Sequence, residues 1–385
     1  MVGLSVLAPN RKSDLLFNKL PLSIKIFCVG GAVRDLFLGR KNSDKDYLLV
    51  GANLQIISTF NLQPVGKSFP VFLHPETKEE VALARKEQKK GVGYKGFVFF
   101  TNKKITLEED LQRRDLTVNA MAVDESGKLH DPFNGVQDLK KRILKHVSPA
   151  FREDPLRIIR LGRFLSELPS FSVHPSTLNL CKEMVKTKEI YELSRERIWR
   201  EVFKGLEAES PKKMIKFFSS CGAWKQITGI HDATPCFYKF LETTFAKKVH
   251  PKWLAALLFQ DNDIKKIKCA LPKNIGQLII FLQRTKTLRN EFIKNFQNKN
   301  LNAENILDIG IHGGILRNPT TLDEFLNCTF FNHPKQMHFL ENCFRSVLEE
   351  PIFTVLKQNK DKTKIKKEIY SFRTKHIRKF IKNLS

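Results

Sequence analysis

A pair of glycines, Gly30 and Gly31, stands between an apolar segment and a short helical pattern. The preceding residues IKIFCV favour a buried strand, and the following residues AVRDLFLG favour a short helix. In a strand–Gly–Gly–helix turn the backbone approaches a bound triphosphate closely, and the positive end of the helix faces the anion. This turn therefore predicts a head of strands and helices with a phosphate site, to which Arg34 adds a cation one helical turn later.

Two aspartates follow the glycine pair after twelve intervening residues, as Asp44-Lys45-Asp46. The segment DYLLVG favours a second strand, so we expect Asp44 and Asp46 to project from one face of it. Adjacent carboxylates repel each other unless a divalent cation lies between them, and Mg²⁺ is held in this way beside substrate phosphates. Two surface aspartates at a strand end are the alternative, but the glycine turn at this spacing favours the metal site.

A second polar cluster contains Arg113, Arg114, Asp115 and Asn119, within the segment LEEDLQRRDLTVNAMA. Its spacing is helical, so we expect Asp115 and Asn119, four residues apart, to lie on one helix face. There they would contact ribose hydroxyls while Arg114 binds a phosphate. An aspartate N-cap with solvated flanking arginines is the alternative.

A third cluster, Glu153-Asp154-Pro155-Leu-Arg157, opens a helical pattern that carries Arg160 and Arg163. Asp-Pro is a typical helix start, so an N-cap at Asp154 with Arg157 as its ion-pair partner is one interpretation. Cytosine and adenine both present an amine donor beside a ring-nitrogen acceptor, whereas uracil and guanine reverse this order. An Asp acceptor beside an Arg donor therefore predicts selection of C and A. Arginines spaced by three spiral around a helix, so Arg160 and Arg163 favour phosphate or RNA contacts instead.

The organisation of the chain changes near residue 145, where the helical period becomes dominant. We expect an α+β fold, in which a head with a small mixed or antiparallel sheet precedes an elongated, all-helical part. The predicted divisions are a lead-in over 1–25, the head over 26–145, and helical segments over 146–205 and 206–385.

The charge of the chain favours a polyanionic partner, since 66 Lys and Arg against 40 Asp and Glu give a formal net charge of +26. The last 35 residues hold 11 Lys and Arg against 2 Asp and Glu. Their apolar residues are spaced for an amphipathic helix, at Ile365, Ile369, Phe372 and Phe380. For this helix, contact with RNA phosphates or a solvated face is favoured over an anionic membrane surface.

Segments that would indicate a membrane or secreted protein are not recognised. No stretch approaches about 18 consecutive apolar residues, so no membrane-spanning helix is expected. The N-terminus lacks a basic region before its short apolar run and makes a poor signal peptide. Seven cysteines without metal-ligand spacing favour reduced thiols in the cytoplasm.

Several segments in fixed order resemble the bacterial class II tRNA nucleotidyltransferases, the CCA-adding enzymes of the DNA polymerase beta-like superfamily. They are VGGAVRD with DKDYLLVG, FPVFLHPETKEEVALAR, LEEDLQRRDLTVNAMA, HDPFNGVQDL and HVSPAFREDPLRIIRLGRF. The resemblance is dense over about residues 26–165, thinner at RERIWRE with Arg197 and Glu201, and weak beyond about 225. It implies a catalytic head, a neck that recognises the nucleotide base, and a body and tail that bind tRNA.

The resemblance implies template-independent addition of C, C and A to tRNA 3′ ends from CTP and ATP, with Mg²⁺ as cofactor and pyrophosphate released. Catalysis and metal binding would fall on Asp44 and Asp46, with Glu80 as a further candidate carboxylate. Nucleotide binding would fall on Gly31, Arg34, Arg114, Asp154, Arg157, Arg160 and Arg163. The segment KKGVGYKGF at 89–97 would match a flexible loop that helps to switch from C to A addition.

Two other functions share these features. A bacterial poly(A) polymerase has GGxVRD, DxD and RRD-like segments, and a non-catalytic RNA-binding protein on the same scaffold is a third possibility. One departure from the family concerns the HD phosphohydrolase domain that several bacterial members carry. At its position this chain has Gln260-Asp261 in LAALLFQD, and a glutamine amide is a poor transition-metal ligand. We therefore expect no phosphohydrolase activity and no nickel or zinc site here.

Overall fold

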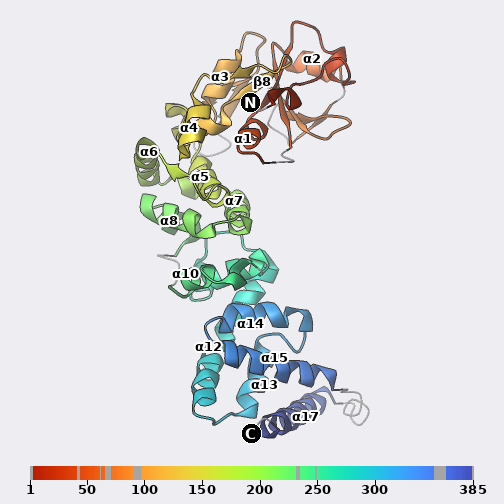
Figure 1. The fold of residues 1–385 in the computed structure, drawn as a ribbon, viewed down its shortest axis with the longest axis vertical. Helices are drawn as coiled ribbons and strands as arrows, with labels where there is room; N and C mark the ends of the chain where they lie inside the picture. The colour runs from red at the N-terminus through yellow and green to blue at the C-terminus, as the bar shows by residue number, and fades with distance from the viewer. Residues whose placement is uncertain are drawn as a thin grey trace. The chain divides into compact units, whose positions relative to one another are not determined.

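The computed structural model describes residues 3–40, 44–60, 62–65, 71–89, 97–230, 235–247, 249–350 and 361–383. The chain divides into two compact units, Met1–Glu201 with Lys216–Ile227 and Val202–Ile215 with Thr228–Ser385 (Figure 1). The finer divisions near 145 and 205 stay predictions. In the described part of the chain, no helix is both long and apolar enough to cross a membrane.

A seven-stranded mixed sheet in the order β3-β4-β5-β2-β1-β8-β9 forms the centre of the first unit. Its strands are β1 (Lys25–Val29), β2 (Asp46–Val50), β3 (Gln63–Pro64), β4 (Val71–Leu73), β5 (Glu80–Leu83), β8 (Ala122–Asp124) and β9 (Leu129–His130). Strands β2 and β5 run parallel, and the other neighbouring pairs of this sheet are antiparallel. The predicted fold class, a small mixed sheet followed by helices, is confirmed.

The register of the central strands brings two predicted site segments together. In the antiparallel pair of β1 and β2, Val29 lies opposite Asp46. The glycine turn that follows β1 and the carboxylate that begins β2 therefore lie at the same edge of the sheet. Two further pairings join β6 (Lys86–Lys89) to β7 (Phe97–Phe100), antiparallel, and β10 (Ile143–Leu144) to β11 (Ser172–Val173), parallel.

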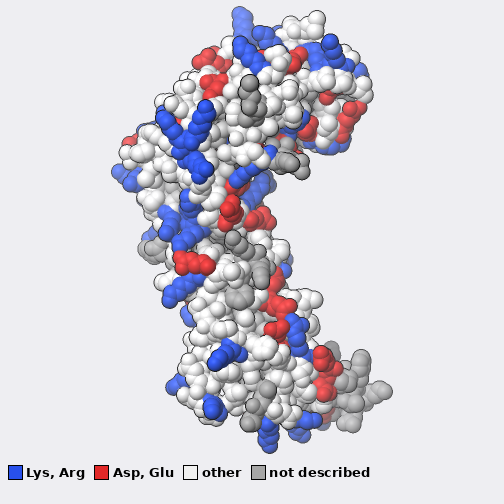
Figure 2. All heavy atoms as spheres, in the orientation of Figure 1, with Lys and Arg blue, Asp and Glu red and all other residues white. Residues whose placement is uncertain are grey.

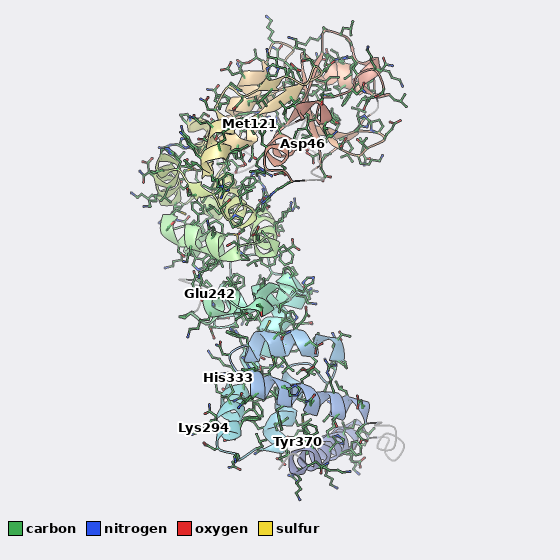
Figure 3. The ribbon with its side chains drawn as sticks, viewed as in Figure 1. Asp46, Met121, Glu242, Lys294, His333 and Tyr370 are labelled. Atoms are coloured by element: carbon green, nitrogen blue, oxygen red, sulfur yellow. The ribbon has the colours of Figure 1, made fainter. Side chains whose placement is uncertain are left out.

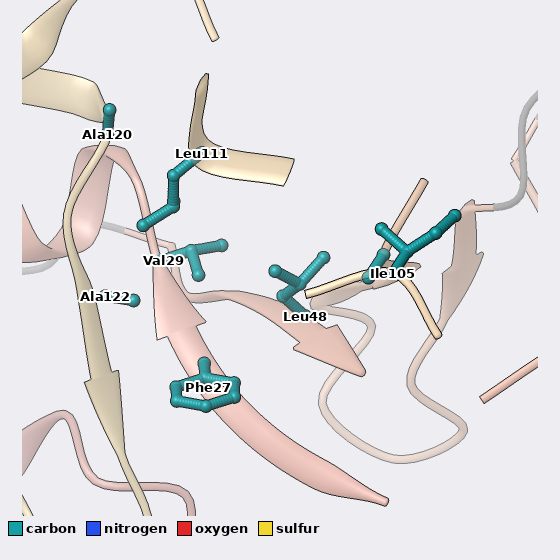
Figure 4. Close-up of a cluster of buried hydrophobic side chains, with 8 residues drawn as sticks. Phe27, Val29, Leu48, Ile105, Leu111, Ala120 and Ala122 are labelled. Carbon is teal, nitrogen blue, oxygen red and sulfur yellow. The ribbon is translucent and has the colours of Figure 1, made fainter. Parts of the chain in front are cut away.

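Both faces of the central strands are buried, which explains their nearly continuous apolar sequence. On one face, Phe27, Val29 and Leu48 pack against Leu111 of helix α3 (Leu107–Gln112) (Figure 4). On the other face, Phe17 from the N-terminal lead-in meets the ring of Tyr47 edge-on, with 4.9 Å between ring centroids. Phe17 is only 1% exposed, so the lead-in is part of the packing of the first unit.

The lead-in is also held by polar contacts. Arg11 donates to the carbonyl oxygen of Leu20 at 2.9 Å and forms an ion pair with Glu125 at 2.9 Å. Asp14 accepts a hydrogen bond from the buried ring of His74, with 3.1 Å between Oδ1 and Nε2. His74 Nδ1 accepts from two backbone N–H groups, so the proton lies on Nε2 and the contact to Asp14 is a donated one.

The helices of the chain follow the predicted order. In addition to α3, those up to residue 228 are α1 (Gly31–Phe37), α2 (Leu54–Ser58), α4 (Gly135–Lys141), α5 (Leu156–Glu167), α6 (Pro175–Lys186), α7 (Arg195–Glu207), α8 (Pro211–Cys221) and α9 (Trp224–Thr228). Later ones are α10 (Pro235–Leu241), α11 (Pro251–Phe259), α12 (Lys273–Gln297), α13 (Ala303–His312), α14 (Leu322–Phe330), α15 (Pro334–Glu349) and α17 (Lys362–Lys382). Proline begins α6 and α11, where its missing N–H costs no hydrogen bond.

The predicted helix through LEEDLQRRDLTVNA is wrong beyond its first turns. Helix α3 ends at Gln112, and Thr117–Asn119 form a separate short 3₁₀ turn. Between them the backbone pairs with another segment, since Thr117 N donates to the carbonyl oxygen of Lys145 at 2.9 Å. Leu116 is extended, with φ of −127° and ψ of 147°, and forms an antiparallel bridge with His146.

Candidate active site

An arginine-rich cavity of about 540 Å³ lies in the first unit, between the glycine turn, the start of β2 and helix α5. Its lining includes the carboxylates Asp46, Glu80, Asp115 and Asp154. Its lining arginines are Arg34, Arg85, Arg113, Arg114, Arg157, Arg160, Arg163 and Arg197. Cations outnumber carboxylates on these walls, so the cavity attracts a polyanionic ligand such as a triphosphate.

Gly30 allows the backbone to approach the cavity and one of its arginines. Its φ of +73° and ψ of −126° lie in a region that other residues avoid. A side chain here would place its Cβ 3.0 Å from Nη1 of Arg114. Gly30 N donates to the carbonyl oxygen of Met121 at 3.1 Å, which fixes the turn against the chain leading into β8 (Figure 3). Gly31, the other predicted phosphate-binding glycine, begins α1 and lines the cavity.

The two aspartates of the Asp44-Lys45-Asp46 segment differ in environment. Strand β2 begins at Asp46, so Asp44 precedes the strand, and the expected common strand face is wrong. Asp44 is exposed, whereas Asp46, which is labelled in Figure 3, is half-buried and lines the cavity. Burial first, and then the charges of Glu80 and Asp44, raise the pKa of Asp46 to about 6 although Arg114 opposes the shift. Asp46 therefore lies in a field of negative charge that a cation would relieve.

These carboxylates fit a hard divalent cation by their chemistry. Carboxylate oxygens are the ligands that Mg²⁺ prefers, and Mg²⁺ completes its coordination with substrate phosphates and water. The like-charge repulsion at Asp46 is the feature of this structure that such an ion would remove. Among the described residues, no group of three or more His, Cys, Asp or Glu is arranged to hold a metal without a substrate.

Arg34 is held in place on two sides. Its Nε and Nη2 donate to Asp35 at 2.8 and 3.0 Å, and its Nη1 donates to Oδ1 of Asn119 at 2.8 Å. The guanidinium carbon also lies 5.4 Å from the centroid of the Phe164 ring on α5. Arg34 is buried, so these contacts hold its head group in one position at the cavity wall.

Asp115 is a buried carboxylate that forms an ion pair with Arg160 and a hydrogen bond with Asn119. Nε and Nη2 of Arg160 approach its Oδ2 at 2.8 and 2.7 Å, and Nδ2 of Asn119 donates to its Oδ1 at 3.1 Å. Burial alone would raise the pKa of Asp115, but the charge of Arg160 and the hydrogen bonds hold it well below its usual range. The charge of Asp115 in turn raises the pKa of Arg160, so the pair stays ionised. Asp115 also accepts from the N–H of Leu116 at 2.8 Å, but the residue that caps the Thr117–Asn119 turn is Leu116, so the N-cap alternative for Asp115 is wrong.

Asp110 is a site residue that the sequence reasoning missed. It is fully buried, and its Oδ1 accepts from Nε of Arg113 at 3.1 Å and from the N–H of Arg85 at 3.3 Å. Its Oδ2 accepts from Nη2 of Arg114 at 3.4 Å. Burial opposes ionisation, but the surrounding arginines lower the pKa of Asp110. Its position three and four residues before two arginines on a helix was the available signal.

The predicted base-reading pair is not an ion pair in this structure. Arg157 donates to the backbone carbonyls of Ala150 at 2.8 Å and Arg113 at 2.6 Å, and its side chain is buried. The carboxylate of Asp154 lies 3.8 Å from Nη2 of Arg197 instead. Asp154 also accepts from the N–H of Leu156 at 3.0 Å, so its helix-capping interpretation holds too, although the first helical residue is Leu156 and not the predicted proline.

Arg163 and the RERIWRE segment meet across two helices. Nε of Arg163 on α5 donates to Oε2 of Glu201 on α7 at 2.6 Å, and Arg163 also pairs with Glu167. The guanidinium of Arg163 lies 4.2 Å from the centroid of the Phe164 ring. All the predicted nucleotide-binding residues therefore line one cavity, and Arg160 and Arg163 lie there in ion pairs.

Comparisons with known proteins find similar sequences among the CCA-adding enzymes. Residues 26–145 match the family model of the poly A polymerase head domain. A CCA-adding enzyme of Bordetella pertussis is 50% identical over 212 residues, 55% of this chain and 58% of that protein. A multifunctional CCA protein of Dechloromonas aromatica is 52% identical over 200 residues, 52% of this chain and 48% of that protein. Over about half of its length, the chain is therefore similar to the CCA-adding nucleotidyltransferases.

Solved structures of CCA-adding enzymes share the fold over nearly the whole chain. A Thermotoga maritima CCA-adding enzyme complexed with tRNA superposes with a TM-score of 0.68 at 17% identity, over 99% of this chain and 98% of that one. A CCA-adding enzyme complexed with CTP gives a TM-score of 0.68 at 19% identity, over 97% and 90% of the two chains. The chain spans about half the length of the curated relatives it matches. Similarity to this family implies a divalent metal.

The family resemblance singled out two further segments. Residues 90–96 of the predicted flexible loop KKGVGYKGF are outside the described residues. At the position of the family's HD pair, Gln260 is buried at the end of α11, and Asp261 forms an ion pair with Lys286 at 2.7 Å. The absence of phosphohydrolase activity stays a prediction.

Proposed function

We propose that this chain adds C, C and A to the 3′ end of tRNA from CTP and ATP, without a nucleic-acid template. The observation that carries the proposal is the single cavity in which the glycine turn, Asp46, eight arginines and Asp154 meet. Its walls combine cations for a triphosphate, a carboxylate whose ionisation a cation would favour, and a polar acceptor on the side of α5. The curated CCA-adding relatives, which match about half of the chain, support the same reaction.

Asp44 and Asp46 would hold Mg²⁺ together with the substrate phosphates. When bound, Mg²⁺ would neutralise phosphate charge and favour attack of the tRNA 3′-hydroxyl on the α-phosphate, with pyrophosphate as the leaving group. Glu80 would act electrostatically, because its charge already contributes to the raised pKa of Asp46. The carboxylates must be ionised to bind the cation, so activity is expected to fall as the pH drops below about 6.

The arginines would bind and orient the triphosphate. Arg114 is suited to this because its buried Nε has no hydrogen-bond partner among the described residues. Each Nη nitrogen of Arg34 carries a second N–H beyond those that contact Asp35 and Asn119. Bidentate guanidinium contacts would hold the nucleotide in one orientation for the attack.

Asp154 would accept the exocyclic amine of cytosine or adenine. Its side chain lines the cavity and lies 3.8 Å from Arg197, which would supply the neighbouring donor. Arg157 would act as a support, since its guanidinium already donates to two backbone carbonyls. Arg160 and Arg163, held by carboxylates, would complete the wall on α5.

The decisive experiment uses purified protein, Mg²⁺ and a tRNA transcript that ends at the discriminator base. Reactions contain CTP, ATP or both, and the 3′ ends are sequenced. Two C residues with CTP alone, and a single A after them when ATP is added, would support the proposal. A long A tail with ATP alone would identify a poly(A) polymerase instead. Bound but unextended tRNA would leave an RNA-binding protein on a nucleotidyltransferase scaffold.

We also propose a cytoplasmic protein without phosphohydrolase activity. Among the described residues, the thiols of Cys28, Cys181, Cys221, Cys328 and Cys343 are buried and form no disulfide, as expected in a reducing compartment. Release of phosphate from 2′,3′-cyclic nucleotides with added nickel or zinc tests the second point, and metal-dependent turnover would contradict it.

A further inference from the structure

Asn119 lies at the cavity wall and is buried, with only 6% of its surface exposed. It nevertheless contacts three polar residues of the site. Its Oδ1 accepts from Nη1 of Arg34 at 2.8 Å, and its Nδ2 donates to Oδ1 of Asp115 at 3.1 Å. Its backbone carbonyl accepts from Nη1 of Arg114 at 3.4 Å. One residue therefore touches both arginines that would bind phosphate and the carboxylate that pairs with α5.

The chemistry of these partners fixes the orientation of the amide. A guanidinium has only donors and an ionised carboxylate has only acceptors, so the oxygen of Asn119 faces Arg34 and its nitrogen faces Asp115. Both ends of the side chain are engaged within the protein. The side chain of Asn119 therefore contacts Arg34 and Asp115, and the ribose contact expected from the sequence stays a prediction.

The backbone that carries Asn119 is held firmly. Asn119 N donates to the carbonyl oxygen of Leu116 at 2.9 Å, and Thr117 N donates to that of Lys145 at 2.9 Å. Helix α4 approaches so closely that a Cβ at Gly135 would lie 2.3 Å from the carbonyl oxygen of Thr117. The amide of Asn119 is thus attached to a rigid turn, whereas an arginine side chain alone has several rotatable bonds.

We propose that Asn119 is a positioning residue, which sets Arg34 and Arg114 for the nucleotide phosphates and links them to the Asp115–Arg160 pair on α5. The polar chain runs from Asp35 through Arg34, Asn119 and Asp115 to Arg160, so that each group restrains the next. This inference rests on the proposed function only in that the ligand is a nucleoside triphosphate.

The substitution Asn119→Asp tests the link with little change of shape. It keeps an acceptor for Arg34 but replaces the donor to Asp115 with a second carboxylate oxygen, which repels Asp115. Displacement of the arginines by about 1 Å is enough for an effect of about 100-fold. We expect CTP affinity, measured by calorimetry with Mg²⁺, and kcat/KM for CTP to fall by about that factor.

Asn305→Asp is the matched control. Asn305 is also buried, and its Nδ2 donates to Oε2 of Glu291 at 3.2 Å in the second unit. The control replaces the same kind of hydrogen bond by the same repulsion far along the chain. We expect it to lower the melting temperature while leaving CTP affinity unchanged. If Asn119→Asp lowers only the melting temperature, as the control does, Asn119 is merely structural and the inference fails.

The double substitution Asp115→Asn with Asn119→Asp provides a rescue test. It exchanges donor and acceptor, so that the 115–119 hydrogen bond re-forms and Arg34 keeps its acceptor, although Arg160 loses its carboxylate. Partial recovery of CTP affinity relative to Asn119→Asp supports the link, and no recovery overturns it. The exchange also removes the repulsion, which keeps the test open if the single variant does not fold.

Calorimetry separates this inference from the proposed function. A wild-type protein that binds CTP but does not extend tRNA would overturn the CCA-adding proposal and leave the affinity comparison valid. Wild-type extension with unchanged CTP affinity and KM in Asn119→Asp would overturn the positioning role alone. A wild-type protein that binds no nucleotide would overturn both.

Discussion

The pKa values of single carboxylates at this site depend on the balance between burial and neighbouring charges. Asp46 is half-buried near Glu80 and Asp44, and its pKa rises to about 6. Asp115 is more deeply buried, yet contact with Arg160 holds its pKa below the usual range. The difference lies in the partner, because a neighbouring arginine favours the charged form of a carboxylate and neighbouring carboxylates disfavour it.

Asp46→Asn is expected to lower the rate of nucleotide transfer by several orders of magnitude. The same substitution is expected to stabilise the metal-free protein. The folded state binds the Asp46 proton more tightly than the unfolded state, where the pKa is near 3.8. The stability that this proton contributes is present at low pH and is lost as the pH rises through about 6. In EDTA, the free energy of unfolding of the variant should exceed that of wild type by more at neutral pH than at pH 4. The two differences should themselves differ by roughly 1–3 kcal/mol.

Urea unfolding of both proteins in EDTA across this pH range measures the effect. Asp124→Asn is the control, because the expected change in stability at neutral pH has the opposite sign. Burial would raise the pKa of Asp124, but hydrogen bonds from His130 and Ser126 lower it to about 2. Its contribution is present above the unfolded pKa and is lost as the pH falls through about 2, so this variant should lose stability at neutral pH. A pH-independent difference for Asp46→Asn would contradict the prediction.

Gly30→Ala is expected to weaken CTP binding about 10-fold or more, because the new Cβ would lie 3.0 Å from Nη1 of Arg114 and displace it. Gly39→Ala is the control, since Gly39 also has a positive φ of +68° but has nothing within 4 Å of the added Cβ. Both variants should lose stability through backbone strain of about 1–3 kcal/mol. Equal CTP affinities of the two variants, measured by calorimetry, would be the contrary result.

At the scale of the element, α5 combines recognition and support on one helix. Its first turn follows Asp154, which lines the cavity, and carries Arg157, which is tied to two backbone carbonyls. Arg160 and Arg163 extend the same wall through their ion pairs with Asp115 and Glu201. The sequence suggested that Asp154 and Arg157 read the base as a pair. Their contacts differ, so we expect substitutions at the two positions to have different effects.

Asp154→Ala is expected to raise misincorporation of UTP and GTP about 10-fold or more with little change in melting temperature, because the acceptor for the exocyclic amine is removed. Arg157→Ala should instead lower stability by about 2–4 kcal/mol, since two carbonyls lose a charged donor. Sequencing of extended tRNA ends and thermal melting separate the two effects. Arg152→Ala is the control, as its exposed side chain pairs with exposed Glu183. Unchanged discrimination in Asp154→Ala would refute the base-reading role.

At the scale of the whole molecule, the net charge of +26 is spread over both units, and Lys and Arg are interspersed with Asp and Glu on the face in Figure 2. The basic helix α17 is not a detached tail. Ile377 is fully buried, Tyr370 donates to Asp308 at 3.2 Å, and Phe380 meets Phe339 with 5.7 Å between ring centroids. One face of α17 therefore packs on α13 and α15. The opposite face is exposed and could contact a polyanionic partner.

Neutralising Lys364, Lys375 and Lys382 together to Gln is expected to weaken tRNA binding. These three lysines are exposed and are spaced by eleven and seven residues, so they lie along one side of α17. Each phosphate that the variant no longer neutralises should reduce the slope of log K against log salt by about 0.9. Filter binding over a salt series measures this, with KM for CTP unchanged. The Lys→Arg variant at the same positions keeps the charge and should bind normally; an unaltered slope in the Gln variant would assign these lysines to solvent.

The sequence by itself determined the elements and the candidate residues. The strand and helix around Gly30 and Gly31, the strand at DYLLVG and the successive helices after residue 150 follow from local periodicity, which depends on neighbouring residues alone. The order of the polar segments was enough to predict the resemblance to CCA-adding enzymes, and curated CCA-adding enzymes match about half of the chain. The predicted site residues follow from the same segments, because each cluster carries its own chemistry.

Only the tertiary structure decided how these residues use their polar groups. Helix α3 stops at Gln112 because the next segment pairs with residues 145–147, a contact that no local pattern encodes. Arg157 supports the backbone and Asp110 organises Arg113, since a buried group must find whichever partner the fold brings near. Asn119 changed from an expected ribose ligand to a link between Arg34 and Asp115 for the same reason. Hydrogen-bond partners across long sequence separations depend on packing, and packing is a property of the folded chain.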